Sequence, residues 1–295
     1  MKLLVTGASG MVGTRIRQLA EARGDEVVPL VRRAAREGER YWNPAQGELD
    51  PEVFAGIDAV LHLAGDNIGA GRWTTAKKQL IRDSRVKSTQ LLASQLAQSS
   101  YRPALISASA IGYYGDRGAT DLYESASPGK DFLADVCREW EAAADPARQA
   151  GVRVVNLRIG VVLSRLGGAL ASMLFPFRMG VGGNMGDGRQ FWSWISLDDV
   201  AQIFLYAADQ SSLAGPVNAV SPQPVTNAEF TRVLGRVLRR PTFLPMPAFA
   251  ARIVLGEMAD ALILSSCKVL PGVLQQRGFE FKHPQLEAAL RAALE

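Results

Sequence analysis

The sequence is poor in the residues that build metal sites and disulfide frameworks. Its 295 residues include only two cysteines, Cys137 and Cys267, and two histidines, His62 and His283. Without a CxxC motif or a Cys/His cluster at ligand spacing, neither a thiol redox centre nor a bound metal is expected. No apolar run approaches the roughly 18 residues of a membrane helix, and the N-terminus lacks a signal-peptide core. We therefore expect a cytoplasmic protein without a membrane partner.

The sequence also lacks a large excess of charge of one sign. The 33 basic residues nearly balance the 29 acidic residues, which leaves a formal net charge of +4. Basic side chains do not alternate with aromatic ones, as they do in proteins that bind single-stranded nucleic acids. We therefore expect a small-molecule substrate and no nucleic-acid partner.

The first half of the chain alternates short apolar runs with amphipathic stretches. Strands are expected at residues 2–6, 26–31, 58–63, 104–109 and 152–157, and helices at about 74–98 and 131–149. Continuous apolar strands that alternate with helices indicate a parallel sheet covered on both faces. The sequence therefore predicts an α/β fold with a doubly wound parallel sheet of the Rossmann type.

A glycine-rich turn follows the first expected strand and opens the first expected helix. Its glycines are Gly7, Gly10 and Gly13. The first permits a tight turn, the second lets the backbone approach a diphosphate, and the third lets the helix pack against the strand. The diphosphate would lie on free N–H groups at the positive end of the helix dipole. Other residues of this loop expected to contact a dinucleotide are Ser9, Met11 and Val12.

The second expected strand ends in Val31, Arg32 and Arg33 rather than in a carboxylate. An acidic residue there would bind the ribose 2′-hydroxyl of NAD(H), whereas guanidinium groups suit the 2′-phosphate of NADP(H). We therefore predict NADP(H), bound through these three residues. The alternative is that both arginines are ordinary surface residues.

The strand at residues 58–63 leads into Leu63, Ala64 and Gly65, whose small side chains predict a second wall for the cofactor. His62 lies within this strand. Because the strand is expected to be buried, we interpret His62 as a core histidine rather than a catalytic one.

Beyond residue 160 the alternation of strands and helices breaks down. Five glycines fall within residues 180–188, and four prolines interrupt residues 241–271. We therefore divide the chain into an NADP-binding Rossmann domain, residues 1–160, and a smaller substrate lobe, residues 161–295. Segments within residues 190–220 are expected to return to the first domain. A C-terminal helical segment is expected from about residue 245.

Several further motifs occur together in a combination that resembles a known family. Besides the TGxxGxxG loop, they are LAGDNI at residues 63–68, GRW at 71–73, GYYG at 112–115, WEAA at 140–143 and TNAEF at 226–230. This combination resembles the extended short-chain dehydrogenase/reductases of the NAD(P)-dependent epimerase/dehydratase superfamily. Within it the chain is similar to an atypical branch, the epimerase family proteins, which carry a small C-terminal domain of unassigned role. The resemblance covers nearly the whole chain.

One feature of the superfamily is missing from this sequence. Related enzymes use a Tyr-x-x-x-Lys pair as the acid/base apparatus, on the helix expected here at residues 131–149. That stretch contains neither tyrosine nor lysine, and Leu133 and Cys137 fall at the corresponding positions. The resemblance offers Ser109, Tyr113 and Tyr114 as substitutes. The alternative for the two tyrosines is packing at the rim of the site.

The resemblance also implies further contacts with cofactor and substrate. Arg85 is expected to reach the cofactor, the alternative being an arginine on the surface of a helix. Other expected cofactor contacts are Ser107, Gly160 and Val161. Substrate contacts are expected from Arg178, Trp192 and Trp194, although the two tryptophans suit the core of the smaller lobe equally well.

Two functions of different classes fit these observations. The first is an NADP(H)-dependent oxidoreductase or epimerase-like enzyme with a non-standard acid/base. The second is a catalytically silent NADP(H)-binding protein, a redox sensor or scaffold, which the loss of the Tyr-x-x-x-Lys pair favours. Hydride transfer itself needs only an oriented nicotinamide, so we prefer the enzyme. A homodimer is possible in either case.

Overall fold

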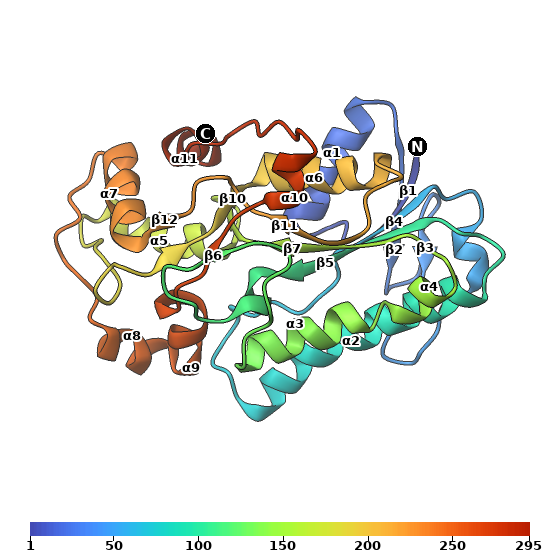
Figure 1. Ribbon diagram of the computed structural model, residues 1–295, viewed down its shortest axis with the longest axis horizontal. Helices are drawn as coiled ribbons and strands as arrows, with labels where there is room; N and C mark the ends of the chain where they lie inside the picture. Colours follow the sequence, from blue (N-terminus) through green and yellow to red (C-terminus); the bar gives the residue numbers. More distant parts are fainter.

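The computed structural model describes residues 1–295 and is built around one parallel sheet (Figure 1). Seven strands form this sheet in the order β11-β7-β5-β4-β1-β2-β3, and all neighbouring pairs are parallel. They are β1 (Lys2–Thr6), β2 (Glu26–Val31), β3 (Arg40–Tyr41), β4 (Ala59–His62), β5 (Ala104–Ala110), β7 (Val154–Ile159) and β11 (Gly215–Ala219). The doubly wound α/β fold expected from the sequence is confirmed.

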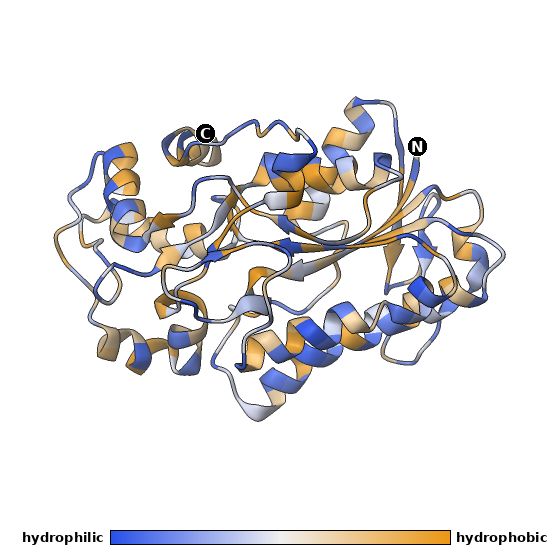
Figure 2. Ribbon diagram, viewed as in Figure 1, coloured by the Kyte–Doolittle hydropathy of each residue, from blue (hydrophilic) through white to orange (hydrophobic).

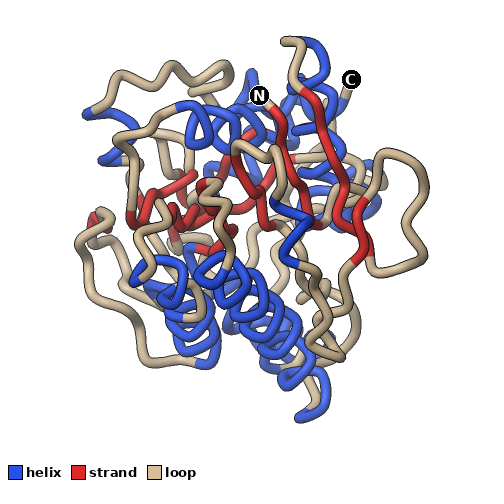
Figure 3. Tube along the Cα trace, turned by 90° about the vertical axis from the view of Figure 1, so that its right-hand side faces the viewer, coloured by secondary structure: helices blue, strands red, loops and turns tan.

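Helices cover both faces of the sheet. On one face lie α1 (Met11–Ala22) and α6 (Leu197–Asp209), and on the other lie α2 (Thr75–Gln98), α3 (Phe132–Ala142) and α4 (Asp145–Gln149) (Figures 1 and 3). Because no face of the sheet meets solvent, its strands are apolar along most of their length, as Figure 2 shows.

Alternate residues of the central strand β1 enter the two layers. Leu3 and Val5 pack with Phe204 of α6, whereas Leu4 packs with Leu92 of α2. All five are buried. Successive side chains of a strand point to opposite faces of its sheet. A strand that is apolar throughout therefore indicates a sheet covered on both faces.

α2 is the longest helix, with 24 residues, and it begins where the sequence predicts. Thr74 caps it, because the Thr74 side chain accepts a hydrogen bond from the Lys77 N–H at 3.1 Å. No helix of the structure combines the length and the apolar composition that a bilayer span requires.

The helix expected at residues 131–149 is in fact two helices. α3 ends at Ala142, and α4 begins at Asp145 with Pro146 in its first turn. Proline is tolerated at the start of a helix, but its ring and its missing N–H interrupt a helix that would run through it. The expectation of one continuous helix is therefore wrong.

Most of the remaining elements form a smaller lobe and its connections, on the left in Figure 1, whereas Phe54 and Leu274 pack in the layers of the large sheet. The short strands are β6 (Asp121–Leu122), β8 (Val161–Leu163), β9 (Phe191–Trp192), β10 (Trp194–Ser196), β12 (Val225–Thr226) and β13 (Lys268–Val269). The helices are α5 (Gly168–Arg178), α7 (Asn227–Leu238), α8 (Ala248–Leu255), α9 (Glu257–Ala259), α10 (Gly272–Gln276) and α11 (Leu286–Leu294). Shorter turns are η1 (Pro51–Phe54), η2 (Ile111–Tyr114) and η3 (Asp260–Leu264).

The two tryptophans expected at the substrate site lie in the core of this lobe. Trp192 and Trp194 are buried and pack in a cluster that includes Phe177 and Phe230. Each indole N–H donates to a backbone carbonyl, of Ile263 at 3.2 Å and of Gln223 at 2.9 Å respectively. The prediction that they contact substrate is therefore wrong, because aromatic side chains beside a glycine-rich loop filled a core instead.

We expect Trp194→Ala to lower the free energy of unfolding by about 3–5 kcal/mol, because truncating a buried aromatic side chain leaves a cavity. Urea unfolding measures this change. Leu166→Ala is the control, because Leu166 is 75% exposed and its truncation should change stability by less than about 0.5 kcal/mol. A loss of under about 1 kcal/mol for Trp194→Ala would contradict the core role.

Candidate dinucleotide site

The turn between β1 and α1 has the backbone that its glycines predict. Gly7 has a φ of +68°, which side-chain-bearing residues rarely adopt. The Gly10 N–H donates to the Gly7 carbonyl at 2.9 Å and closes the turn. A Cβ on Gly13 would lie 2.2 Å from the Gly7 oxygen, so only glycine lets the helix approach this closely.

The N-terminus of α1 is open to an anion. Gly10 is its N-cap residue, no side chain caps the helix, and its first turn has no acidic residue. The first N–H groups of a helix lack intrahelical partners and carry the positive end of its dipole. Ser9 and Gly10 are exposed, while Met11 and Val12 are half-buried. The turn thus presents free backbone donors where a diphosphate would bind.

A hydrogen-bond network joins this turn to the loop after β4. The Leu63 and Ala64 N–H groups donate to Thr6 Oγ1 at 3.0 and 3.1 Å. The Thr6 hydroxyl then donates to Nδ1 of His62 at 2.8 Å, and Nε2 of His62 lies 3.0 Å from Thr89 Oγ1. Because Thr6 Oγ1 already accepts two N–H bonds, its own proton is assigned to the bond with Nδ1, and the imidazole proton is assigned to Nε2. The loops after the two central strands are therefore held together at the edge where the strand order reverses.

His62 is a core residue, as the sequence indicates. It is fully buried, and burial lowers its pKa to about 3. The ring is neutral in the folded protein at neutral pH, which is the state that the hydrogen bond from Thr6 requires.

The two arginines after β2 differ in what they contact. Arg32 is exposed and has no hydrogen-bond or salt-bridge partner in the structure. Arg33 instead forms a bidentate pair with Glu39, at 2.6 Å for both bonds. The Arg33 guanidinium is the main reason that the pKa of Glu39 is lowered to about 2. Of the two arginines predicted to bind the 2′-phosphate, Arg32 is therefore unpaired and Arg33 is engaged by a carboxylate.

Arg85 of α2 lies under the second wall of the site. Its guanidinium donates to the carbonyls of Asp66 and Ile81, both at 3.0 Å. A Cβ on Gly65 would lie 3.3 Å from the Arg85 Cζ, and the guanidinium lies 5.2 Å from the Trp140 ring centroid. Burial lowers the pKa of Arg85. It is thus packed beside the predicted cofactor wall and is not a simple surface arginine.

A second arginine, on β7, lies buried beside the end of β5. Arg158 forms a bidentate pair with Glu141 of α3, at 2.8 and 2.9 Å. Ser109 donates to the same carboxylate at 2.7 Å. Ser109 is 2% exposed and its hydroxyl is engaged, so the structure leaves it little surface with which to hold a substrate oxygen.

The two tyrosines at residues 113–114 have different environments. Tyr114 is fully buried, donates to Asn218 Oδ1 at 2.7 Å, and accepts from Arg158 at 3.0 Å. Burial raises the pKa of Tyr114 to about 12, and its prediction as a catalytic residue is wrong. Tyr113 is half-buried, its ring centroid lies 3.5 Å from the Arg158 Cζ, and its hydroxyl makes no hydrogen bond. Of the two, only Tyr113 has a hydroxyl free to meet a ligand.

The other residues predicted to contact cofactor or substrate differ in how exposed they are. Ser107 is buried, and its hydroxyl bonds to the Ala108 carbonyl at 3.2 Å, so its side chain offers the cofactor little surface. Gly160 and Val161 are half-buried and lie where β7 passes into β8. A Cβ on Gly160 would lie 2.5 Å from the Ser193 carbonyl oxygen. Arg178 is exposed at the end of α5.

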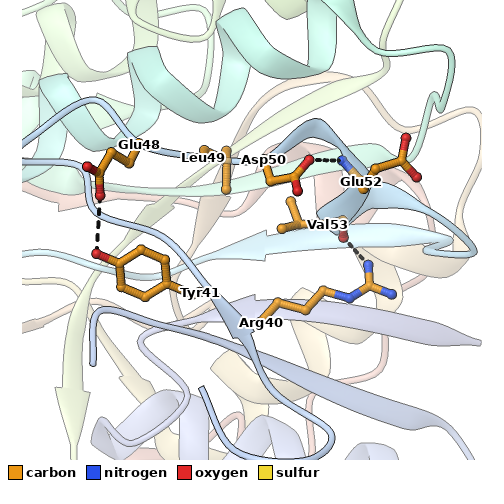
Figure 4. A pocket seen from close by; sticks show the side chains of 7 residues that line it. All are labelled: Arg40, Tyr41, Glu48, Leu49, Asp50, Glu52 and Val53. Carbon is orange, nitrogen blue, oxygen red and sulfur yellow. Dashed lines mark hydrogen bonds between the residues drawn. The ribbon is translucent and has the colours of Figure 1, made fainter. Parts of the chain in front are cut away.

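A surface hollow of about 560 Å³ lies outside this site, at the edge strand β3 (Figure 4). Its polar groups are bonded to one another: Tyr41 donates to Glu48, and the Asp50 side chain accepts from the Glu52 N–H. Three carboxylates line it, and these would repel a phosphate. The hollow therefore does not extend the phosphate site.

Comparison with known proteins identifies the family. Residues 3–219 match the family described as "NAD dependent epimerase/dehydratase family", and residues 246–293 match a "Domain of unknown function". An epimerase family protein of Mycobacterium bovis is 44% identical over 287 residues, which are 97% of this chain and 95% of that protein. The crystal structure of human epimerase family protein SDR39U1 with NADPH is 34% identical, covers 100% of both chains, and has a TM-score of 0.89.

The chain belongs to the NAD-dependent epimerase/dehydratase family. The family and the small C-terminal domain, both predicted from motifs, are confirmed. A nicotinamide dinucleotide is the cofactor of this family, which agrees with the glycine-rich turn. UDP-glucose 4-epimerase of Thermus thermophilus has a TM-score of 0.74 at 18% identity, so it shares the fold.

Against the family pattern, the missing acid/base pair is evident in the structure. Leu133 and Cys137 are buried on α3, on the side that faces the turn after β5. Burial raises the pKa of Cys137 to about 12, so this thiol is no substitute acid/base at neutral pH.

Sequence reasoning missed two features of the site. The sequence shows Thr6 only as the end of a strand, whereas in the structure it links the turn at Gly7 to the loop after β4. The ion pair of Glu141 and Arg158 joins residues 17 positions apart, so no local sequence pattern predicts it. The pairing of β5 with β7 could have placed Arg158 beside Ser109, since these two residues are register partners.

We expect the stability of the protein to fall as pH drops from about 6.5 toward 3, partly because of His62. The pKa of His62 is lowered in the folded state, so in this pH range the unfolded chain binds a proton at His62 and the folded chain does not. Protonation therefore favours unfolding as the pH falls. This group contributes a slope of at most about 1.4 kcal/mol per pH unit in that window.

Urea unfolding at pH 7 and pH 5 measures this pH dependence. In His62→Gln the difference between the two pH values should shrink, because the neutral amide does not titrate. An unchanged difference would show that His62 is not responsible.

Proposed function

We propose that this chain is an NADP(H)-dependent oxidoreductase or epimerase-like enzyme whose acid/base group differs from the Tyr-x-x-x-Lys pair. The observation that supports it most directly is the turn at Gly7, with open N–H donors and an unpaired Arg32 at the end of the neighbouring strand. The human relative crystallised with NADPH supports the same cofactor.

The residues present fit a dinucleotide. Cβ atoms at Gly7 and Gly13 would fill the space between the turn and its neighbours, and glycine leaves this space to backbone and ligand. The diphosphate would lie on the N–H groups of Met11 and Val12, and Arg32 would hold the 2′-phosphate. When bound, NADPH supplies a hydride to the substrate.

Arg32, rather than Arg33, is the expected 2′-phosphate ligand. A guanidinium already bound to a carboxylate, as Arg33 is to Glu39, has fewer donors and a neutralised charge. NAD(H) lacks the phosphate, so it gains nothing from Arg32.

Tyr113 is the residue we propose as proton donor. Its hydroxyl is unengaged, and the stacked guanidinium of Arg158 fixes the ring. Glu141 and Ser109 position Arg158 in turn, because both of the Arg158 bonds to Glu141 depend on the orientation of that carboxylate. The phenol of Tyr113 would then lie near the end of β5. It would be carried by the turn η2, whereas the family's tyrosine is carried by the helix that corresponds to α3.

The second candidate is a catalytically silent NADP(H)-binding sensor or scaffold. The buried Leu133 and Cys137 at the family's acid/base positions favour it. For the enzyme we propose a small-molecule substrate, and for the sensor the redox state of the cofactor as its signal. For both functions we propose no nucleic-acid partner and a homodimer as the assembly.

We expect Arg32→Asp to weaken NADPH binding by about tenfold or more, while NADH binding changes little. Calorimetric titration of both cofactors measures the two dissociation constants. Arg33→Ala is the matched control, and it should change the NADPH affinity less than Arg32→Asp does. If Arg32→Asp keeps the full preference for NADPH, the assignment of Arg32 fails.

We expect Tyr113→Phe to lower the turnover number by about 10²–10⁴-fold, because it removes the proton donor, with the NADPH dissociation constant unchanged. The measurement is NADPH consumption over a panel of ketones, aldehydes and sugar nucleotides. NADPH binding by the wild-type protein without turnover on any substrate would favour the sensor instead.

A further inference from the structure

Helix α8 of the C-terminal domain is apolar on nearly all sides and yet exposed. Its sequence, AFAARIVL, has one charge, and only Ala251 is buried. Phe249, Ile253 and Val254 are 66%, 68% and 62% exposed. A helix that is hydrophobic all round normally lies in a core or against a ligand or partner, because exposing this much apolar surface is unfavourable.

Contacts hold α8 against the loop that follows the cofactor wall. The Arg72 guanidinium donates to the Ile253 carbonyl at 2.5 Å. Lys78, at the start of α2, forms an ion pair with Glu257, the first residue of α9. The loop that starts at Gly65 therefore reaches α8 and α9, which lie beside one another at the lower left of Figure 1.

The same end of this loop also meets the position of the missing acid/base. Trp73 packs edge-on against Phe132, with ring centroids 5.5 Å apart, and Phe132 precedes Leu133 on α3. The Trp73 indole N–H is bonded to the Ile68 carbonyl at 2.8 Å, which leaves the ring as an apolar surface. Because Arg72 and Trp73 are consecutive residues, α8 and the start of α3 both lie at this end of the loop.

The cations at this end of the loop are already engaged. Arg72 bonds to a backbone carbonyl, and Lys78 is shared between Glu257 and the face of Phe132. A sugar-nucleotide diphosphate needs free cations for its two charges. An apolar group needs only surface to cover, and α8 offers it.

We propose that α8 forms a wall of the substrate site and that the substrate presents an apolar body to it, such as an aliphatic chain or an aromatic ring. This assigns a role to the C-terminal domain, and it rests on the proposed NADP(H)-dependent function. The residues that carry it are Phe249, Ile253 and Val254 of α8, with Trp73 and Phe132 on the side of the cofactor domain.

The test is binding of decan-2-one and of UDP-glucose to the NADPH-loaded protein, followed by tryptophan fluorescence and calorimetry. We expect the ketone to bind and UDP-glucose not to. Ile253→Glu should weaken the ketone about tenfold or more, because it places a charge on the apolar wall. Tyr123→Glu is the control at an exposed aromatic side chain beside α10, 46% exposed, and should change the affinity less than about twofold. Neither variant should alter the NADPH dissociation constant.

Three results would overturn the proposal. The first is that wild-type protein binds NADPH but not decan-2-one. The second is UDP-glucose binding that Ile253→Glu leaves unchanged. The third is that Ile253→Glu shifts the protein between monomer and dimer in size-exclusion chromatography at unchanged ketone affinity, since α8 would then cover a second copy. If wild-type protein binds no NADPH, the proposed function fails, and the ketone titration of the cofactor-free protein still decides the role of α8.

Discussion

The site depends on one buried hydroxyl. Thr6 Oγ1 accepts hydrogen bonds from two backbone N–H groups of the loop after β4 and donates its proton to His62. This fixes the turn at Gly7 against the loop at Leu63, and a Cβ on Gly7 would lie 3.1 Å from the Leu63 carbonyl carbon. The neutral, buried imidazole is what makes the network possible, because a protonated ring could not accept from Thr6. The open end of α1 and the second cofactor wall are therefore positioned together.

Near the turn at Gly7, the family's tyrosine and lysine are absent, and two arginines lie close to their positions. The helix that normally carries tyrosine and lysine carries Leu133 and Cys137, and both are buried. Two arginines lie close by: Arg85 beneath the loop after β4, and Arg158 between Glu141 and Tyr113. A guanidinium does not lose its proton at physiological pH, so these groups can orient a partner or stabilise negative charge but cannot serve as bases. That is why the proposed proton donor is a neighbouring phenol.

The sequence predicted well those features that depend on local pattern. Strand and helix periodicity predicted the parallel sheet, and the glycines predicted the backbone of the turn at Gly7, because each needs a residue type at a fixed spacing. The sequence predicted less where tertiary packing decides the environment of a side chain. Trp194 entered a core, Tyr114 became a buried hydrogen-bond donor, and Arg33 found Glu39 across a short loop. In each case the residue has two environments compatible with its chemistry, and only the fold selects one.

The most direct test of the account is a crystal structure of the protein grown with NADPH. The account predicts diphosphate oxygens within hydrogen-bond distance of the N–H groups of Met11 and Val12, and the 2′-phosphate beside Arg32. A crystal grown at saturating NADPH that shows the dinucleotide elsewhere, or the turn at Gly7 without it, would contradict the account.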